Sequence, residues 1–205
     1  MNYKSIKDPS EVTYTVERSK FIGNVAKVNS VDDAQKFIKE ISQRYNNATH
    51  NCWAYKVHEE GREIANYSDN NEPSGTAGKP IYGVIEKFGL SNVAIVVTRY
   101  FGGVKLGIRG LIDAYSKTAE EVVKASKVVT YEKTFIYEAK CDYSNFSFIQ
   151  NLMQKQNNFK ITEQKFSDEV YFIFEISENN KDDVLSLIKN KVYNLNFVGN
   201  SEVIS

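Results

Sequence analysis

The sequence predicts an α+β protein made of two domains, and three observations support this. The chain has 205 residues, more than the roughly 100–150 of the commonest single domain. Eight of the eleven glycines fall between residues 75 and 110, and only Gly199 occurs in the last 73 residues. After residue 132 the hydrophobic pattern restarts. We therefore expect a first domain over residues 1–132 and a second over residues 133–205.

Hydrophobic periodicity predicts the elements of the first domain, because strands repeat every two residues and helices every three or four. The first hairpin should turn near Arg18 to Lys20, and the second around Glu60 and Gly61. The expected elements are two strands within residues 11–28, a helix over 30–45, strands at 50–58 and 62–68, a loop over 69–80, a short helix over 81–89, a strand over 93–98 and a helix over 111–126.

The strand at 93–98 reads "VAIVVT" and has no polar alternation, as expected for a central strand buried on both faces. Its end leads directly into "RYFGGVKLGIRG", residues 99–110. An amphipathic pattern follows from Leu111. This motif is therefore expected to connect a strand to a helix.

The second domain is expected to have the order βαββαβ, the split arrangement of ferredoxin-like domains. It carries eight lysines, no arginine and ten acidic residues, a net charge of −2. The expected elements are a strand over residues 134–141, a helix over 144–156, strands at 159–166 and 169–177, a helix over 182–190 and a strand over 196–204.

Charge and composition limit the classes of function. The formal net charge is zero, so the chain lacks the overall basicity of many nucleic-acid binders, yet residues 75–110 carry a net +4. No apolar run is long enough for a membrane helix, and no secretory signal is present at the start, so we expect a cytoplasmic protein without a membrane partner. Cys52 and Cys141 are expected to be free thiols.

The motif at residues 99–110 has the chemistry of an anion site. Gly102 and Gly103 allow positive φ angles and close backbone approach, and a helix starting near Leu111 would present unpaired N–H groups. Arg99, Lys105 and Arg109 could contact phosphate or carboxylate. The alternative is a tight turn whose cations are only solvated.

A second glycine-containing loop reads "EPSGTAGKP". It does not match a nucleotide-binding P-loop, because Gly75 and Gly78 are too close together and Pro80 follows Lys79. It still offers hydroxyls, backbone amides, a cation and a carboxylate. We expect a phosphate or sulfate between the two loops, with contacts here from Ser74, Gly75, Thr76 and Lys79.

A catalytic alternative rests on His50 and Cys52, which would point to the same side of a strand and could form a base and a thiol nucleophile. Glu72 or Asp69 could orient the base. The other interpretation makes Cys52 a small core residue and His50 a structural one. Adding His58 gives no common metal pattern, so neither a metal nor a cofactor is expected.

Aromatic residues near these loops could stack on bases of single-stranded nucleic acid. Most aromatic side chains pack in cores, and that is the expectation for Trp53 and Tyr55. Tyr100 and Phe101 are different because they lie inside the basic loop.

The segments "ERSKFIGNVAKV", "ATHNCWAYKV", "EPSGTAGKP" and "VVTRYFGGVKLGIRGLIDAY" together resemble the YigZ/IMPACT family over nearly the whole chain. The resemblance implies a first domain with the β-α topology of the second domain of a small-subunit ribosomal protein, followed by a ferredoxin-like domain. It also implies similarity of the pair to the carboxy-terminal domains of elongation factor G. Because eukaryotic members are linked to control of translation, the resemblance implies a translation-related role.

Two positions depart from the family pattern. Asn71 stands where the family has a glycine before Glu72, and asparagine tolerates a left-handed backbone. Arg109 stands at a usual glycine, where a bulky cation would either strengthen or obstruct an anion site.

The leading hypothesis is a protein that binds RNA, or a ribosome-associated partner, through the face formed by Lys79, Arg99, Lys105 and Arg109. The first alternative is a hydrolase for a small phosphate- or carboxylate-bearing substrate that uses His50, Cys52 or Glu72. The second is an interaction scaffold whose loops are only structural.

Overall fold

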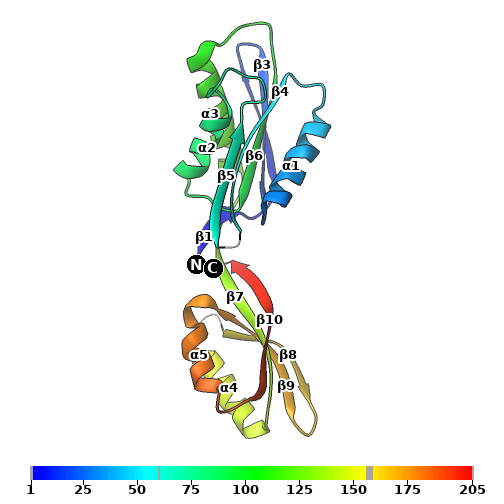
Figure 1. Cartoon of the computed structure of the whole chain (residues 1–205), viewed down its shortest axis with the longest axis vertical. Coiled ribbons are helices and arrows are strands. Elements are labelled where there is room, and N and C mark those ends of the chain that lie inside the picture. Colours follow the sequence, from blue (N-terminus) through cyan, green and yellow to red (C-terminus); the bar gives the residue numbers. More distant parts are fainter. Residues whose placement is uncertain (1, 60, 156–158, 205) are drawn as a thin grey trace. The chain divides into compact units, whose positions relative to one another are not determined.

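The computed structural model describes residues 2–59, 61–155 and 159–204 (Figure 1). The chain forms two compact units, one spanning Tyr3–Val129 and the other starting at Thr130. The expected boundary between residues 132 and 133 falls inside the strand β7 (Val128–Cys141). No helix in the described part of the chain is both long and apolar enough to span a bilayer.

The first unit contains both strands and helices. Its elements, in chain order, are β1 (Tyr3–Ile6), β2 (Ser10–Val16), β3 (Ser19–Lys27), α1 (Val31–Arg44), β4 (His50–Glu59), β5 (Arg62–Ser68), α2 (Gly78–Lys87), β6 (Val93–Tyr100) and α3 (Gly107–Ala125).

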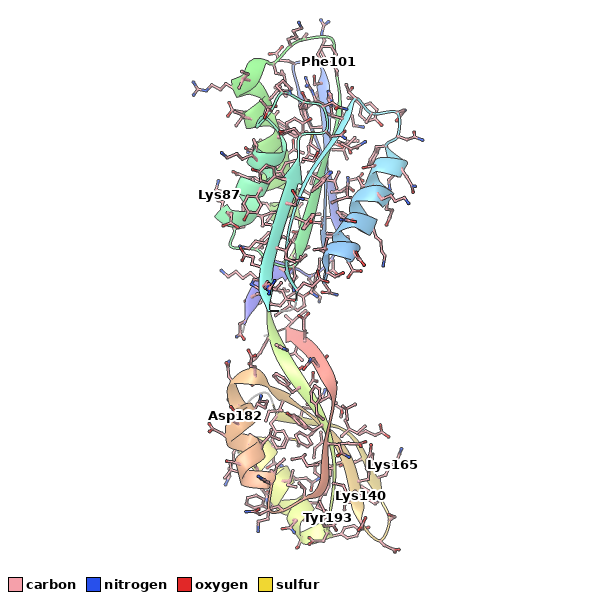
Figure 2. The ribbon with its side chains drawn as sticks, in the orientation of Figure 1. Lys87, Phe101, Lys140, Lys165, Asp182 and Tyr193 are labelled. Atoms are coloured by element: carbon pink, nitrogen blue, oxygen red, sulfur yellow. The ribbon has the colours of Figure 1, made fainter. Side chains whose placement is uncertain are left out.

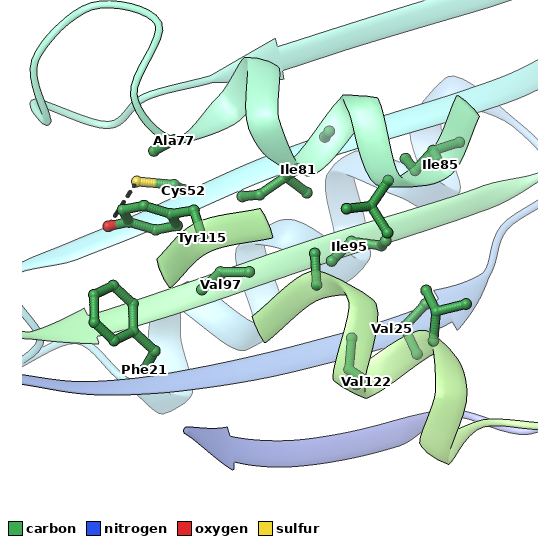
Figure 3. Packing of buried hydrophobic residues seen from close by; sticks show 14 of the residues in the cluster. Phe21, Val25, Cys52, Ala77, Ile81, Ile85, Ile95, Val97, Tyr115 and Val122 are labelled. Atoms are coloured by element: carbon green, nitrogen blue, oxygen red, sulfur yellow. Dashed lines mark hydrogen bonds between the residues drawn. The ribbon is translucent and has the colours of Figure 1, made fainter. Parts of the chain in front are cut away.

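An antiparallel sheet in the order β2-β3-β6-β4-β5 forms the centre of this unit. In Figure 1, α1 covers one face of the sheet and α2 and α3 cover the other. The larger core lies between the sheet and α2 and α3, where Phe21, Ile95 and Tyr115 are fully buried (Figure 3). A smaller core lies under α1. This is the α+β architecture expected for the first domain.

Several predicted features are confirmed. The strand β6 is central and residues 93–98 are buried, because both of its faces are covered by helices. The helix α1 begins after Ser30, whose side chain accepts a hydrogen bond from the Asp33 N–H, and it ends at Arg44, before Asn46.

The boundaries of other elements differ from the predictions. The first hairpin turns at Glu17 and Arg18, which have φ angles of 45° and 64°, whereas Ser19 and Lys20 already belong to β3. Two positive φ angles match the twist of the flanking strands. The prediction that α3 begins near Leu111 is wrong, because the helix already starts at Gly107 and includes Arg109 and Gly110.

The ends of other helices and strands differ less from the predictions. The helix α2 begins at Gly78 rather than residue 81, and the strand β1 was not predicted because it is only a few residues long. Glu60, expected in the second hairpin turn, and Gln156, expected in a helix, lie outside the described residues.

The second unit has the predicted βαββαβ order and a sheet in the order β10-β7-β9-β8 with antiparallel neighbours. Its core buries aromatic residues such as Phe146, Phe172 and Phe174. Because the two outer strands in space are the second and fourth in sequence, this is a ferredoxin-like arrangement. Its elements after β7 are α4 (Tyr143–Lys155), β8 (Phe159–Phe166), β9 (Val170–Ser177), a single 3₁₀ turn (Glu178–Asn180), α5 (Lys181–Ile188) and β10 (Tyr193–Ile204).

Candidate functional site

The predicted site residues come together at one end of the first unit's sheet. The start of β4, the end of β6 and the start of β3 lie side by side there, since Arg99 pairs with both His50 and Phe21 in the sheet register. The loops after β5 and β6 close over this end. Figure 2 labels Phe101 at this end of the sheet. We call this region the loop end of the first unit.

Arg99 is buried, although the sequence suggested a surface cation. Its Nη1 atom lies 2.6 Å from Oε1 of Glu72, and the two side chains are only 6% and 3% exposed. The central carbon of the guanidinium lies 5.4 Å from the ring centroids of both Phe21 and Phe101. Its Nε atom is buried and has no hydrogen-bond partner among the described residues. Arg99 is therefore positioned as an internal charge that holds the loop of Glu72.

Glu72 gathers further polar groups. The Tyr115 hydroxyl donates to Glu72 Oε1 at 2.9 Å, and burial together with the nearby Cys52 and Glu72 raises the pKa of Tyr115, so the hydroxyl stays protonated. His50 Nδ1 donates to the Asn70 carbonyl oxygen at 2.8 Å, and its Nε2 lies 3.8 Å from Glu72 Oε1. The ion pair with Arg99 and the hydrogen bond from Tyr115 satisfy a carboxylate that would otherwise be costly to bury.

Cys52 lies in the same cluster but has the properties of a structural residue. It is fully buried, its thiol donates to the Asp69 carbonyl oxygen at 2.9 Å, and its sulfur is 3.4 Å from the Tyr115 hydroxyl oxygen (Figure 3). Burial raises the pKa of Cys52 to about 12. Because the thiolate is the reactive form, this thiol is a poor nucleophile at neutral pH.

Asp69 occupies the amides of the glycine-containing loop. Its carboxylate accepts hydrogen bonds from the backbone N–H groups of Gly75, Ala77 and Gly78 at 2.8–2.9 Å. Burial alone would raise the pKa of Asp69, but these three donors outweigh it and hold the pKa below its ordinary value. Asp69 thus caps the start of α2, and the donors expected to hold an external phosphate at this loop are already used.

The other residues of this loop that were expected to contact an anion differ in their exposure. The Thr76 hydroxyl donates to the Pro73 carbonyl oxygen at 2.7 Å and is buried. Ser74 and Lys79 are exposed. Lys79 forms no ion pair with any other described residue, which leaves its charge available to a partner.

The loop between β6 and α3 is held against the first hairpin. The Phe101 N–H donates to Thr49 Oγ1 at 3.0 Å, and the Gly102 N–H donates to Ser19 Oγ at 3.2 Å. A Cβ atom at Gly102 would lie 2.1 Å from the carbonyl carbon and oxygen of Arg18, so only glycine fits there. Gly103 has a φ of 86°, which also favours glycine.

Among the described residues, α3 has no counterpart of the Asp69 carboxylate that caps the start of α2. The N-cap residue of α3, Leu106, makes no side-chain capping bond, and no acidic residue lies in the first turn. Lys105 and Arg109 flank this start, and both are exposed and free of ion pairs with other described residues. Farther along the helix, Lys117 is paired with Glu121 at 3.0 Å. Since the Arg109 side chain is exposed, it does not fill the interior of the loop.

A groove of about 730 Å³ runs beside this loop, between β2 and α3. Val104, Lys105 and Leu106 form part of its wall. Glu17, Asp113 and Glu120 also line it, so the groove is not uniformly positive.

No group of three or more His, Cys, Asp and Glu side chains in the described ranges is arranged to hold a metal ion. His58 lies elsewhere on β4, where its Nδ1 is 2.7 Å from the Ser91 hydroxyl oxygen. Tyr115, Ser19 and the capping role of Asp69 were not predicted from the sequence. Only Tyr115 had a signal, because its position on the inner side of the amphipathic helix places it under the loop end.

Comparison with known proteins covers both units. The family model described as "Impact N-terminal domain" matches residues 17–123, and the one described as "Domain of unknown function (DUF1949)" matches residues 140–191. The chain is 38% identical to "IMPACT family member YvyE" of Bacillus subtilis over 83% of this chain and 78% of that protein. It is 30% identical to "IMPACT family member YigZ" of Escherichia coli over 71% of this chain and 72% of that protein.

A solved structure supports the fold over almost the full length. The "Crystal structure of an hypothetical protein" aligns with a TM-score of 0.67 at 23% identity and covers 97% of both chains. At this level of identity the likeness extends to the fold and not to the activity.

Proposed function

The chain belongs to the IMPACT family, and from this premise we propose that its first unit binds RNA of the translation apparatus through exposed cations at the loop end. The link of eukaryotic family members to translational control suggests the source of the RNA. The single observation that carries the proposal is the start of α3, where Lys105 and Arg109 have no ion-pair partner among the described residues and the N-cap Leu106 gives no side-chain cap.

An uncapped helix start favours anions because its first N–H groups and its dipole are positive. The cations add Coulomb attraction, and Arg109 can donate two parallel hydrogen bonds to a phosphate. Lys79 supplies a further free charge from the start of α2. The sequence also suggested that Arg99 contacts the anion. In this proposal Arg99 instead pairs with Glu72 and stabilises the loop.

The hydrolase alternative is weaker on physical grounds. A nucleophilic Cys52 would need an exposed thiolate, whereas this thiol is buried and its pKa is raised to about 12. Glu72 is committed to Arg99 and Tyr115. The observed contacts of His50 do not favour a particular reaction. We therefore propose the binding function.

The test is the salt dependence of RNA binding by the full chain, measured by fluorescence anisotropy with a labelled mixed-sequence oligoribonucleotide. Phosphate contacts release counterions, so the logarithm of the affinity should fall linearly with the logarithm of salt concentration. Lys105→Ala and Arg109→Ala should each weaken binding and lower the slope by about 0.7. Lys79→Ala should have the same effect.

Lys87→Ala is the matched control, because Lys87 lies on α2 of the same unit but is paired with Glu120 at 2.6 Å. It should leave the affinity and the slope unchanged. RNA binding that is insensitive both to salt and to the three test substitutions would reject the proposal.

A further inference from the structure

We propose that the exposed face of Phe101 stacks on a base of single-stranded RNA while the free cations around it hold the neighbouring phosphates. This inference rests on the proposed function and deepens it, because it names the form of RNA and the side chain that distinguishes it. Four features of the loop end support it in turn: the exposure of the ring, its support from below, the anchoring of its backbone and the charges around it.

Phe101 is a large apolar side chain left in water. It is 46% exposed, whereas Phe21, whose ring centroid lies at the same 5.4 Å distance from the Arg99 guanidinium carbon, is fully buried. An aromatic ring with one accessible face can stack on any base, and this contact does not require a particular sequence.

The Phe101 ring lies against the guanidinium of Arg99. The central carbon of the Arg99 guanidinium lies 5.4 Å from the Phe101 centroid, within cation–π range. Arg99 cannot move freely, because its Nη1 is held by Glu72 and its Nη2 lies 3.4 Å from Ser19 Oγ. The buried ion pair therefore fixes the guanidinium against which the Phe101 ring packs.

The backbone beneath the ring is also fixed. The N–H groups of Phe101 and Gly102 donate to Thr49 Oγ1 and Ser19 Oγ, from two different neighbouring segments. Gly102 is in close contact with the backbone of Arg18. A side chain whose backbone is already ordered loses less conformational entropy on binding, so its contact contributes more to affinity.

The charges around Phe101 favour RNA over an apolar partner. Lys105 and Arg109 follow the ring on the same loop and helix start, and Arg18 lies against Gly102. All three are exposed and form no ion pair with other described residues. An aromatic ring on a loop that also carries free cations matches the alternation of bases and phosphates along a single strand. A duplex keeps its bases stacked inside and cannot offer this contact.

The experiment compares two labelled probes with the full chain by fluorescence anisotropy. One probe is oligouridylate, whose bases are free to stack on a side chain, and the other is an abasic oligoribose phosphate of the same length. The two probes carry the same phosphates, so any preference for oligouridylate measures the contribution of the bases. The wild-type chain should prefer oligouridylate.

Phe101→Ala should lower the affinity for oligouridylate by about tenfold, in line with the effect of removing other stacking side chains, and leave the abasic probe unchanged. Phe101→Trp should keep the preference. Phe101→Leu should lose it while keeping the melting temperature, because leucine preserves apolar packing on Arg99. Phe148→Ala is the matched control, since Phe148 is 42% exposed and has a lysine, Lys191, 5.7 Å from its ring in the other unit.

The failure of this inference can be distinguished from failure of the proposed function. If Lys105→Ala and Arg109→Ala weaken both probes but Phe101→Leu and Phe101→Ala weaken neither, or both equally, stacking is rejected and phosphate binding stands. If the wild-type chain binds neither probe, both proposals are rejected. An equal loss for Phe148→Ala would also reject a specific role of Phe101.

Discussion

Arg99 and Glu72 are joined by a 2.6 Å ion pair between Nη1 and Oε1, in a place where both side chains are almost fully buried. Arg99 is the second-last residue of the central strand β6, and Glu72 belongs to the loop after β5. The pair therefore links a rigid strand to the loop that leads into α2. Tyr115 on α3 donates to the same carboxylate oxygen, so three separate segments meet at Glu72.

Removing one partner of this pair should strongly destabilise the first unit. Glu72→Ala leaves a buried guanidinium without its counter-charge, and we expect the free energy of unfolding to fall by about 3–5 kcal/mol. Arg99→Met should have a similar effect, and the double substitution should cost less than the sum. Trp53, the single tryptophan, lies on β4 of this unit, so its fluorescence in a urea titration reports this unit's unfolding.

The exposed pair of Lys87 and Glu120 provides the comparison, with a contact of the same length but a lysine side chain that is 60% exposed. Lys87→Ala should change the unfolding free energy by less than about 1 kcal/mol. Equal, small effects of Glu72→Ala and Lys87→Ala would show that burial of the first pair is not maintained in solution.

Both cysteines should resist alkylation in the folded chain. Cys52 and Cys141 are buried, and burial raises their pKa values to about 12 and about 11. Native protein should therefore react with neither iodoacetamide nor a chromogenic disulfide reagent near neutral pH, and both thiols should react in denaturant. Rapid native modification at Cys52, located by peptide mass spectrometry, would contradict its placement and revive the nucleophile hypothesis.

Asp69 should make the first unit sensitive to acid. Its folded pKa is depressed, so its contribution is present above the ordinary aspartate value of about 3.9 and is lost as pH falls through the lower folded value. Asp69→Asn removes the charge that caps α2 and should destabilise the unit by about 1 kcal/mol at pH 7. The difference between the two proteins should shrink as the pH falls below about 3.9 and should disappear below the depressed folded pKa. A constant difference across the Trp53-monitored pH series would refute the capping role.

Two glycines should respond in opposite ways to alanine. Gly102→Ala places a Cβ atom 2.1 Å from Arg18 backbone atoms, so the loop must move and the melting temperature should fall clearly. Gly83 lies inside α2 with no heavy atom within 4 Å of an added Cβ. Gly83→Ala should raise stability by about 0.5–1 kcal/mol, because alanine restricts the unfolded chain and favours helix. Scanning calorimetry would check both, and a tolerated Gly102→Ala would contradict the tight contact.

Local patterns were sufficient to predict most of the fold. The uninterrupted apolar run at 93–98 predicted a central strand, and the βαββαβ order predicted the topology of the second unit. The sequence predicts the start of α3 too late, because Gly107 and Gly110 are typical of a loop and yet belong to the helix. Glycine lowers helix propensity, but packing of the following amphipathic residues outweighs that cost over a helix of this length.

The internal pairing of the site was harder to predict. Two-residue periodicity places Arg99 on the same side as the buried Val97, so its burial could have been anticipated, but its partner could not. Asp69 caps a helix that starts nine positions later in the chain, beyond the three-residue spacing of a capping box. Such partners depend on how a loop folds back, which residue spacing alone does not determine.

The short segment of Asp69 to Glu72 has a consequence for how this corner could be redesigned. One of its carboxylates neutralises the amides at the start of α2, and the other neutralises the guanidinium of Arg99. The glycine-containing loop and the buried arginine thus each already bind a carboxylate, and both carboxylates belong to the chain itself. To make a receptor for a small anion here, a designer would replace these two acids and leave the glycines unchanged. The two carboxylates occupy the donors that an external anion would need.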